Sequence, residues 1–148
     1  MRVVIQRVSE ASVNINNNYE EKINKGYVIL LGISISDTKD DLEYLVSKIE
    51  KLRIFEDENE KMNLSIKDIN GEILLISQFT LYANTKEGNR PSFVESMKFE
   101  DANKMYEAFK ERLKKTNIPF KTGEFGADMK VSLINDGPVT IIIDSKDR

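Results

Sequence analysis

Apolar and polar residues alternate near the start of the chain, in the pattern of extended strands. Residues 2–8 and 11–15 carry β-branched side chains at near-alternate positions, as expected of strands with one buried face. Residues 27–35 are apolar almost throughout, which is typical of a strand covered on both faces. Three consecutive asparagines at 16–18 predict a short turn between extended segments. We therefore expect the N-terminal third of the chain to be sheet.

Two later segments have the spacing of amphipathic helices. The first is expected to be capped by Ser36 or Asp37 and to end near Lys51. The second is expected from Phe99 to Lys115, with Lys and Arg gathered in its last turns, where they suit the helix dipole. The apolar stripes consist of Leu42, Leu45, Val46, Ile49 and Leu52 in the first helix and of Ala102, Met105, Tyr106, Phe109 and Leu113 in the second.

Sheet is predicted again after the first helix and near the end of the chain. Asn70-Gly71 is a turn signal, and the apolar run that follows it predicts a strand at residues 72–78. Residues 129–134 and 139–144 predict two strands, joined by a hairpin turn at 135–138. The resulting element order, β-β-β-α-β-α-β-β, indicates an α/β domain.

The element order and the chain length together predict the architecture. A chain of 148 residues suits one domain, and no Pro/Gly/Ser-rich linker or internal repeat divides it. We expect a single domain over residues 1–148. Its sheet should be mixed, largely antiparallel and curled into a barrel-like core, with two main amphipathic helices.

Composition narrows the chemistry. The chain has no histidine and no cysteine, which excludes a Ser-His or Cys-His nucleophile, an ordinary zinc site and a disulfide framework. No metal and no cofactor are expected. The net charge of -3 argues against broad binding to a nucleic-acid backbone, although it allows a grip on one RNA end. No apolar run approaches the ~20 residues of a membrane span, and no signal-peptide layout is present, so a cytoplasmic location is expected.

The end of the predicted strand at 72–78 carries the most informative cluster, Ser77-Gln78-Phe79-Thr80-Leu81. Thr80 is one candidate nucleophile, but its hydroxyl would need a lysine or a carboxylate as its base. A second interpretation is that Ser77 and Thr80 satisfy backbone groups at a strand end, with Phe79 in the core. A third is that the backbone N–H groups of Phe79 and Thr80 form an oxyanion hole.

Three other segments are weak signals when taken singly. Gly137-Pro138 fits an ordinary hairpin turn. Residues 123–129 have two glycines on either side of Phe125, a pattern that allows close backbone approach to a ligand or a bend before a strand. Arg90 lies beside a proline in a polar loop, where it could meet a phosphate or satisfy local structure.

Taken together, these segments resemble the signature motifs of the D-aminoacyl-tRNA deacylases, also called D-tyrosyl-tRNA deacylases. The resemblance covers the whole chain. The Ser-Gln-Phe-Thr form also favours the standard enzyme over its animal paralogue, which carries Pro-Gln-Ala-Thr there. The matching segments lie at residues 4–8, 11–13, 52–55, 61–64, 77–81, 88–93, 123–129 and 135–140.

The resemblance implies a deacylase-type fold and a homodimer with its active site at the subunit interface. The expected substrate is the acceptor end of a tRNA that carries a D-amino acid or mischarged glycine, and no membrane is involved. Gly137-Pro138 would be cis and would reach into the partner's pocket, with Arg7 helping to hold it. Met129 and Phe125 would belong to the substrate pocket, and Gln78 would orient the substrate.

The resemblance also favours a route to hydrolysis that needs no protein base. The ribose 2'-OH next to the ester would help to activate water, with the N–H groups near Phe79 and Thr80 as the oxyanion site. Thr80 as a covalent nucleophile is the second choice. Two other functions remain open, a non-catalytic module that binds RNA ends and a general esterase that depends on Thr80 and a lysine.

Overall fold

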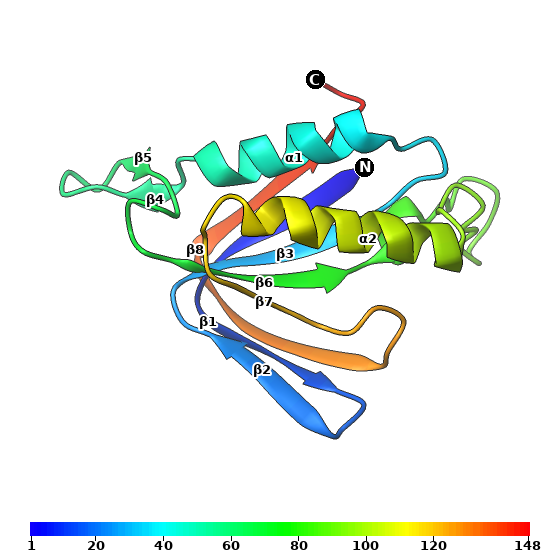
Figure 1. The fold of residues 1–148 in the computed structure, drawn as a ribbon, viewed down its shortest axis with the longest axis horizontal. Coiled ribbons are helices and arrows are strands. Elements are labelled where there is room, and N and C mark those ends of the chain that lie inside the picture. The colour runs from blue at the N-terminus through cyan, green and yellow to red at the C-terminus, as the bar shows by residue number, and fades with distance from the viewer.

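A curved six-stranded sheet forms the centre of the protein in the computed structural model, which describes residues 1–148. Helices α1 and α2 lie side by side over one part of the sheet, and the rest of the sheet curls away beneath them (Figure 1). A short two-stranded hairpin projects at one end. The elements are β1 Arg2–Ile15, β2 Tyr19–Ile23, β3 Gly26–Gly32, α1 Lys39–Lys51, β4 Phe55–Glu56, β5 Met62–Leu64, β6 Glu72–Ser77, the 3₁₀ turn η1 Phe79–Tyr82, α2 Phe99–Lys114, β7 Phe120–Thr122 and β8 Met129–Asp144.

The sheet is mixed, as predicted. Its order is β2-β1-β3-β6-β7, and β8 pairs with the other edge of β1. β1 is antiparallel to its three partners, whereas β3, β6 and β7 run parallel to one another. The Lys121 ammonium of β7 donates a hydrogen bond of 2.8 Å to the Lys22 carbonyl of β2. This contact joins the two ends of the strand order and gives the sheet its barrel-like form.

Two apolar cores lie on opposite faces of β3 and β6. Alternate residues of these strands, such as Ile29 and Leu75, face the helices and pack with their buried stripes. The intervening residues, such as Val28 and Leu74, face the inside of the curled sheet. Burial on both faces explains why these strands are continuous apolar runs, since residues that alternate along a strand point to opposite sides.

The ends of the described chain meet beside α1. The Met1 amino group pairs with the buried Asp37 carboxylate and donates a hydrogen bond of 2.7 Å to the Ser145 hydroxyl. Asp37 was expected as a possible helix cap, but the cap is Thr38. The Asp41 carboxylate accepts a hydrogen bond of 2.8 Å from the Thr38 N–H. The Asp37 carboxylate therefore binds the amino group of Met1, a contact that the spacing of apolar residues does not predict.

Three local predictions were wrong. Residues 2–8 and 11–15 are parts of one strand, β1, which bends at register shifts near Val8. Residues 135–138 form no hairpin turn between two strands, because β8 continues through them and pairs with β1 on both sides of a bulge at residues 136–139. The strand predicted to residue 78 ends at Ser77, and η1 follows it. Strands β2, β4, β5 and β7 were not predicted, since β2 is mostly polar and the two or three residues of the others are too few to show a period.

No helix in the structure has both the length and the apolar character that crossing a membrane requires.

Candidate active site

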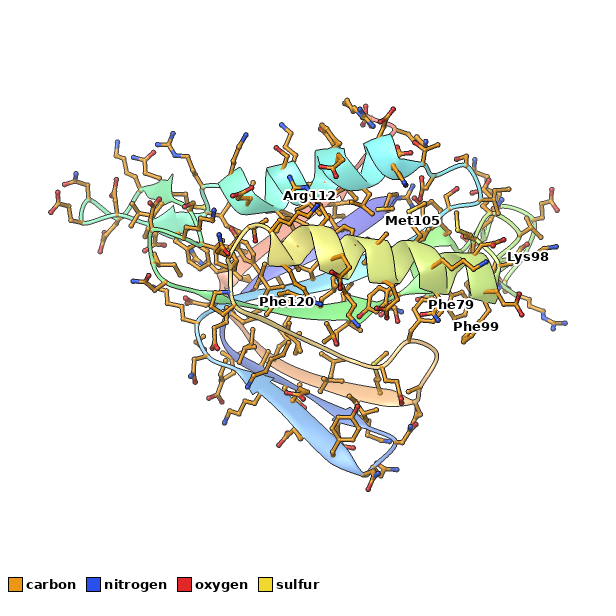
Figure 2. The ribbon with its side chains drawn as sticks, in the orientation of Figure 1. Phe79, Lys98, Phe99, Met105, Arg112 and Phe120 are labelled. Atoms are coloured by element: carbon orange, nitrogen blue, oxygen red, sulfur yellow. The ribbon has the colours of Figure 1, made fainter.

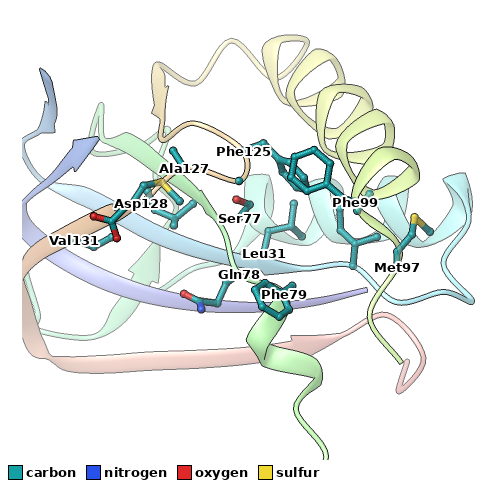
Figure 3. Close-up of a pocket in the computed structure, with 15 residues that line it drawn as sticks. Leu31, Ser77, Gln78, Phe79, Met97, Phe99, Phe125, Ala127, Asp128 and Val131 are labelled. Carbon is teal, nitrogen blue, oxygen red and sulfur yellow. The ribbon is translucent and has the colours of Figure 1, made fainter. Parts of the chain in front are cut away.

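A pocket of about 610 Å³ lies where β6 ends, beside the start of α2. Its walls come from four parts of the chain: the end of β3, the end of β6 with η1, the segment that leads into α2 with the first turn of that helix, and the segment that leads into β8 with the start of that strand (Figure 3). Most of the lining is apolar, which suits a ligand with a flat or apolar part. The lining residues are Leu31, Ile33, Ile76, Ser77, Gln78, Phe79, Met97, Phe99, Ala102, Phe125, Gly126, Ala127, Asp128, Met129 and Val131.

The first wall is a strand end that turns sharply. The Gln78 N–H donates a hydrogen bond of 2.7 Å to the Leu31 carbonyl of β3, which is the last sheet contact. The chain then enters η1, where the Leu81 N–H donates to the Gln78 carbonyl at 3.2 Å. The N–H groups of Phe79 and Thr80 come first in this turn, and a helical turn leaves its first N–H groups without partners inside the turn.

Two side chains hold η1 from outside by its carbonyl oxygens. The Ser96 hydroxyl donates a hydrogen bond of 3.1 Å to the Phe79 carbonyl. The Arg2 guanidinium donates one of 2.8 Å to the Leu81 carbonyl. The Phe79 ring is 57% exposed and packs edge-on against Phe93, with ring centroids 5.0 Å apart. Phe79 is therefore a surface residue at the pocket mouth and does not belong to the core.

The polar groups of the signature segment divide between the pocket and the surface. Ser77 and Gln78 line the pocket, whereas Thr80 is exposed and does not line it. The Gln78 amide nitrogen donates a hydrogen bond to the Thr80 hydroxyl oxygen. No lysine or carboxylate is hydrogen-bonded to that hydroxyl, so the structure holds no base in contact with Thr80.

The opposite wall depends on close contact between residues 123–129 and α2. Phe125 packs against Phe99 and Tyr106, at centroid distances of 5.1 and 5.4 Å. Gly126 has φ +79, and a Cβ there would lie 2.5 Å from the Phe99 ring. The Phe99 side chain lies at the same end of the molecule as Phe79 of the first wall (Figure 2). Glycine at 126 thus lets this wall close on an aromatic ring of the same chain, and the predicted approach of this backbone to a ligand stays a prediction.

The pocket contains little that could act as an acid or a base near neutral pH. Burial raises the pKa of Tyr106, behind Phe125, well above its ordinary value. Asp128 is the one charged residue of the lining, and it is exposed. The structure has no group of three or more acidic side chains arranged to hold a metal ion. The available chemistry is therefore that of amides, hydroxyls and backbone N–H groups.

Gly137 and Pro138 lie outside this pocket, in the middle of β8. They are exposed, joined by a cis peptide bond, and absent from the lining of the pocket in the same chain. Arg7 lies beneath them, only 5% exposed. Its guanidinium donates hydrogen bonds of 2.8 Å to the carbonyls of Asp136 and Ile54. Arg7 therefore ties the base of this loop to the segment before β4.

The structure thus brings five of the predicted site residues together in one pocket and places the other four outside it. Ser77, Gln78, Phe79, Phe125 and Met129 line the pocket, whereas Thr80, Arg7, Gly137 and Pro138 do not.

Several contributors were missed from the sequence. Met97 and Phe99 line the pocket, and Ser96 supports η1. Phe99 was predicted only as the start of a helix, although it lies three residues before Ala102 and seven before Tyr106, on the side of the apolar stripe, and is 62% exposed. Its spacing, which continues the stripe into the first turn of the helix, was the available signal.

Comparisons with known proteins point to one family. The model of the family described as D-Tyr-tRNA(Tyr) deacylase matches residues 4–144. A D-aminoacyl-tRNA deacylase of Finegoldia magna is 59% identical over 146 residues, covering 99% of each chain. One of Flavobacterium psychrophilum is 60% identical over 149 residues, covering 100% of this chain and 99% of its own.

Solved structures share the fold. A protein described as "c-Myc DNA Unwinding Element Binding Protein" has a TM-score of 0.90 and 44% identity, covering 97% of this chain and 98% of its own. A probable eukaryotic D-amino acid tRNA deacylase has a TM-score of 0.80 at 16% identity, covering 96% of this chain and 97% of its own. At that identity the similarity supports the fold alone. From the family match and the identities over nearly the full length, the chain belongs to the D-Tyr-tRNA(Tyr) deacylase family.

Proposed function

We propose that this protein is a hydrolase that cleaves the ester joining a D-amino acid to the 3' end of tRNA, and that it also removes glycine mischarged onto tRNA. The observation that carries the proposal is the 59% identity, over 99% of both chains, to a protein named D-aminoacyl-tRNA deacylase. The mainly apolar pocket, with an amide and a hydroxyl at one side, suits the terminal adenosine and its ester. The reaction is proofreading of charged tRNA, which takes place in the cytoplasm.

The working unit is a homodimer whose two active sites each use both subunits. Gly137 and Pro138 are exposed and do not line their own pocket, which supports their entry into the pocket of a second copy. Ile134 and Ile142, on either side of them along β8, are 54% and 68% exposed. Exposed apolar residues around a projecting loop are typical of a surface that a partner covers.

Selection by this loop works through exclusion. Rigid backbone on the L-face of the substrate's α-carbon leaves no room for a side chain there, whereas a D-amino acid directs its side chain away. Glycine has no side chain to exclude, so the same wall admits it. The pocket therefore monitors the α-carbon and not the identity of the side chain.

Hydrolysis uses the backbone and the substrate. Water attacks the ester carbonyl carbon, and the N–H groups of Phe79 and Thr80 stabilise the negative charge that develops on the carbonyl oxygen. The 2'-OH next to the ester orients and helps to activate that water. The bond from the carbonyl carbon to the ribose 3' oxygen then breaks, and that oxygen takes up the proton that the attacking water has lost, which leaves a free amino acid and a tRNA with a free 3'-OH. Gln78 orients the substrate, and Met129 and Phe125 contact the adenosine.

The two alternative functions, a general esterase and a module that binds RNA ends, require different properties of the pocket. A general esterase would need Thr80 as its nucleophile, yet the hydroxyl oxygen accepts a hydrogen bond from Gln78 and has no hydrogen-bonded lysine or carboxylate. That environment lowers its nucleophilicity. A module that only binds RNA ends would use the same pocket without turnover, so a rate measurement distinguishes it from the enzyme.

The test is deacylation of D-tyrosyl-tRNA and L-tyrosyl-tRNA by the purified protein in the presence of a chelator. Rapid loss of the D-ester alone is the expected result. Loss of both esters at similar rates would point to a general esterase. Loss of neither would point to a binding module, and activity that disappears with the chelator would contradict the metal-free route.

A further inference from the structure

The strand β8 bulges outward where it carries Gly137 and Pro138. Gln6 of β1 pairs with Thr140, and Val8 pairs with Asn135. Residues 136–139 therefore stand opposite the single residue Arg7, and the chain between the two paired positions must leave the plane of the sheet. A loop of this kind has no ladder hydrogen bonds of its own, so its direction depends on the side chains at its base.

Asn135 supplies such contacts on the side of the loop that Arg7 does not reach. Its carboxamide oxygen accepts a hydrogen bond of 2.9 Å from the Val139 N–H, which closes the loop across its base. Because a backbone N–H can only donate, this contact fixes which end of the amide is oxygen. The amide nitrogen then donates to the Gln6 side-chain oxygen at 2.9 Å and to the Thr140 hydroxyl at 3.1 Å.

The loop is thus held at two points. Arg7 holds the carbonyl of Asp136, before the tip, at 2.8 Å. Asn135 holds the N–H of Val139, after the tip, and is itself held by Gln6 from β1. A segment fixed on one side of its tip can still pivot, whereas one fixed on both sides cannot. The second attachment therefore determines the direction of Gly137 and Pro138.

We propose that Asn135, oriented by Gln6, is a positioning residue that sets how strictly the enzyme rejects L-amino acids. The inference rests on the proposed function, in which the loop enters the partner's pocket as a steric wall. Exclusion by a wall requires that the wall stay in place, because a wall that can move aside admits the excluded group at little cost. Loss of the Asn135 contacts should therefore affect the L-ester more than the D-ester.

The experiment compares the wild type with Asn135→Ala, Gln6→Ala and the double variant. Amide hydrogen exchange should show faster exchange at Val139 in Asn135→Ala, because its acceptor is gone. The ratio of D-tyrosyl-tRNA to L-tyrosyl-tRNA deacylation rates should fall about tenfold, as for loss of one well-placed hydrogen bond. The fall should come mainly from a faster reaction of the L-ester.

The other variants separate positioning from general damage. Gln6→Ala should lower the ratio by a smaller factor, and the double variant should be no worse than Asn135→Ala, since both act through one hydrogen bond. Asn14→Ala is the matched control, because Asn14 lies on the adjacent β1 and its carboxamide oxygen is buried without a partner. It should leave the ratio unchanged.

Faster exchange at Val139 with an unchanged ratio would overturn this inference alone. So would an equal fall in both rates, which would indicate a structural role only. A wild-type protein that hydrolyses both esters equally would overturn the proposed function and this inference with it.

Discussion

The turn at the end of β6 and the loop in β8 are both built from signature segments, but they are held in different ways. The first follows a strand whose four central residues are buried, and it is fixed by the sheet through the Gln78 N–H and by contacts from Ser96 and Arg2 to its carbonyls. The second projects from an edge strand and is fixed by the side chains of Arg7 and Asn135. The first borders a pocket in its own chain, and the second does not.

This difference assigns the two regions different tasks. A backbone that follows directly from a paired strand can hold N–H groups in place for chemistry, because the sheet fixes where the turn begins and side chains such as Ser96 only steady it. A loop held by a few side chains can project far enough to reach another subunit, but each of those contacts matters more. Changes that loosen the loop should therefore alter selection, and changes that displace it should lower the rate as well, whereas changes around the turn should alter the rate alone.

Gly137→Ala should have the largest effect. Gly137 has φ +137, and an added Cβ would lie 2.7 Å from the Val139 side chain and 3.0 Å from the Arg7 guanidinium. The loop must shift, and a shift of ~1 Å can cost about 100-fold in rate. Deacylation of the D-ester should fall by about that factor while the circular dichroism spectrum stays native. Gly88→Ala is the control, because Gly88 has φ +147 with nothing within 4 Å of an added Cβ.

Ser96→Ala should have a smaller effect, on rate alone. It removes the hydrogen bond to the Phe79 carbonyl and loosens the turn that presents the N–H groups. We expect kcat to fall about tenfold, in line with one lost hydrogen bond, with KM and the ratio of D-ester to L-ester rates unchanged. Ser92→Ala, in the same loop, should behave as wild type. A changed ratio in Ser96→Ala would contradict the separation of the two tasks.

Thr80→Ala should change the rate less than Ser96→Ala does. The Thr80 hydroxyl is exposed and accepts one hydrogen bond, from Gln78, so its removal should cost about threefold or less. Loss of a covalent nucleophile would instead cost on the order of 10⁶-fold. A substrate with a 2'-deoxy terminal adenosine should be nearly inert with both proteins. An inactive Thr80→Ala that still folds would restore the nucleophile hypothesis.

Asp41→Asn should leave deacylation activity at low temperature unchanged. It should lower the free energy of unfolding of the protein, and so affect the turn at the end of β6 and the loop in β8 alike. Burial alone would raise the pKa of Asp41, but hydrogen bonds from Lys146 and Thr38 outweigh it and hold the pKa well below its ordinary value. A lowered pKa stabilises the fold above the unfolded-state pKa of about 3.9, and this contribution is lost as the pH falls below that value.

Urea unfolding should show the expected loss in Asp41→Asn, about 1–3 kcal/mol at pH 7 and less at pH 3. Asp40→Asn, at the exposed neighbouring position, is the control. A loss in Asp41→Asn that is equally large at both values of pH would contradict the ionic origin of the effect.

The long elements of this fold were predictable because their patterns are periodic. Both helices, the buried strand at β3 and the strand β6 agree with the spacing of their apolar residues. The parallel pairing of β3 with β6 was not predicted, since periodicity gives the faces of a strand and not its neighbours. The bulge in β8 was mistaken for a hairpin, because Gly-Pro is a turn signal wherever it occurs and only pairing with β1 keeps the strand continuous.

The motifs of the candidate site could be predicted from the sequence, but the arrangement of their residues in space could not. Ser77, Gln78 and Phe125 were identified, but their meeting in one pocket depends on how α2 packs on the sheet. Phe99 was missed because the first turn of the helix was left out of the apolar stripe, and Ser96 was missed because it lies in an irregular segment where no spacing rule applies. Asn135 was predicted only as part of a signature motif. Its contacts with Val139 and Gln6 follow from the register of β8 against β1, which the sequence does not show.

That register has a consequence for how the protein folds. β1, which leaves the ribosome before β8, is paired with β8 along nearly its whole length. Contacts so far apart in sequence form slowly, because the intervening chain must be closed into a loop first. Until β8 arrives, one edge of β1 has no partner, and an unpaired apolar edge attracts other chains. Conditions that delay the final strand should therefore favour aggregation, and the Gly137–Pro138 loop is completed only in this last step.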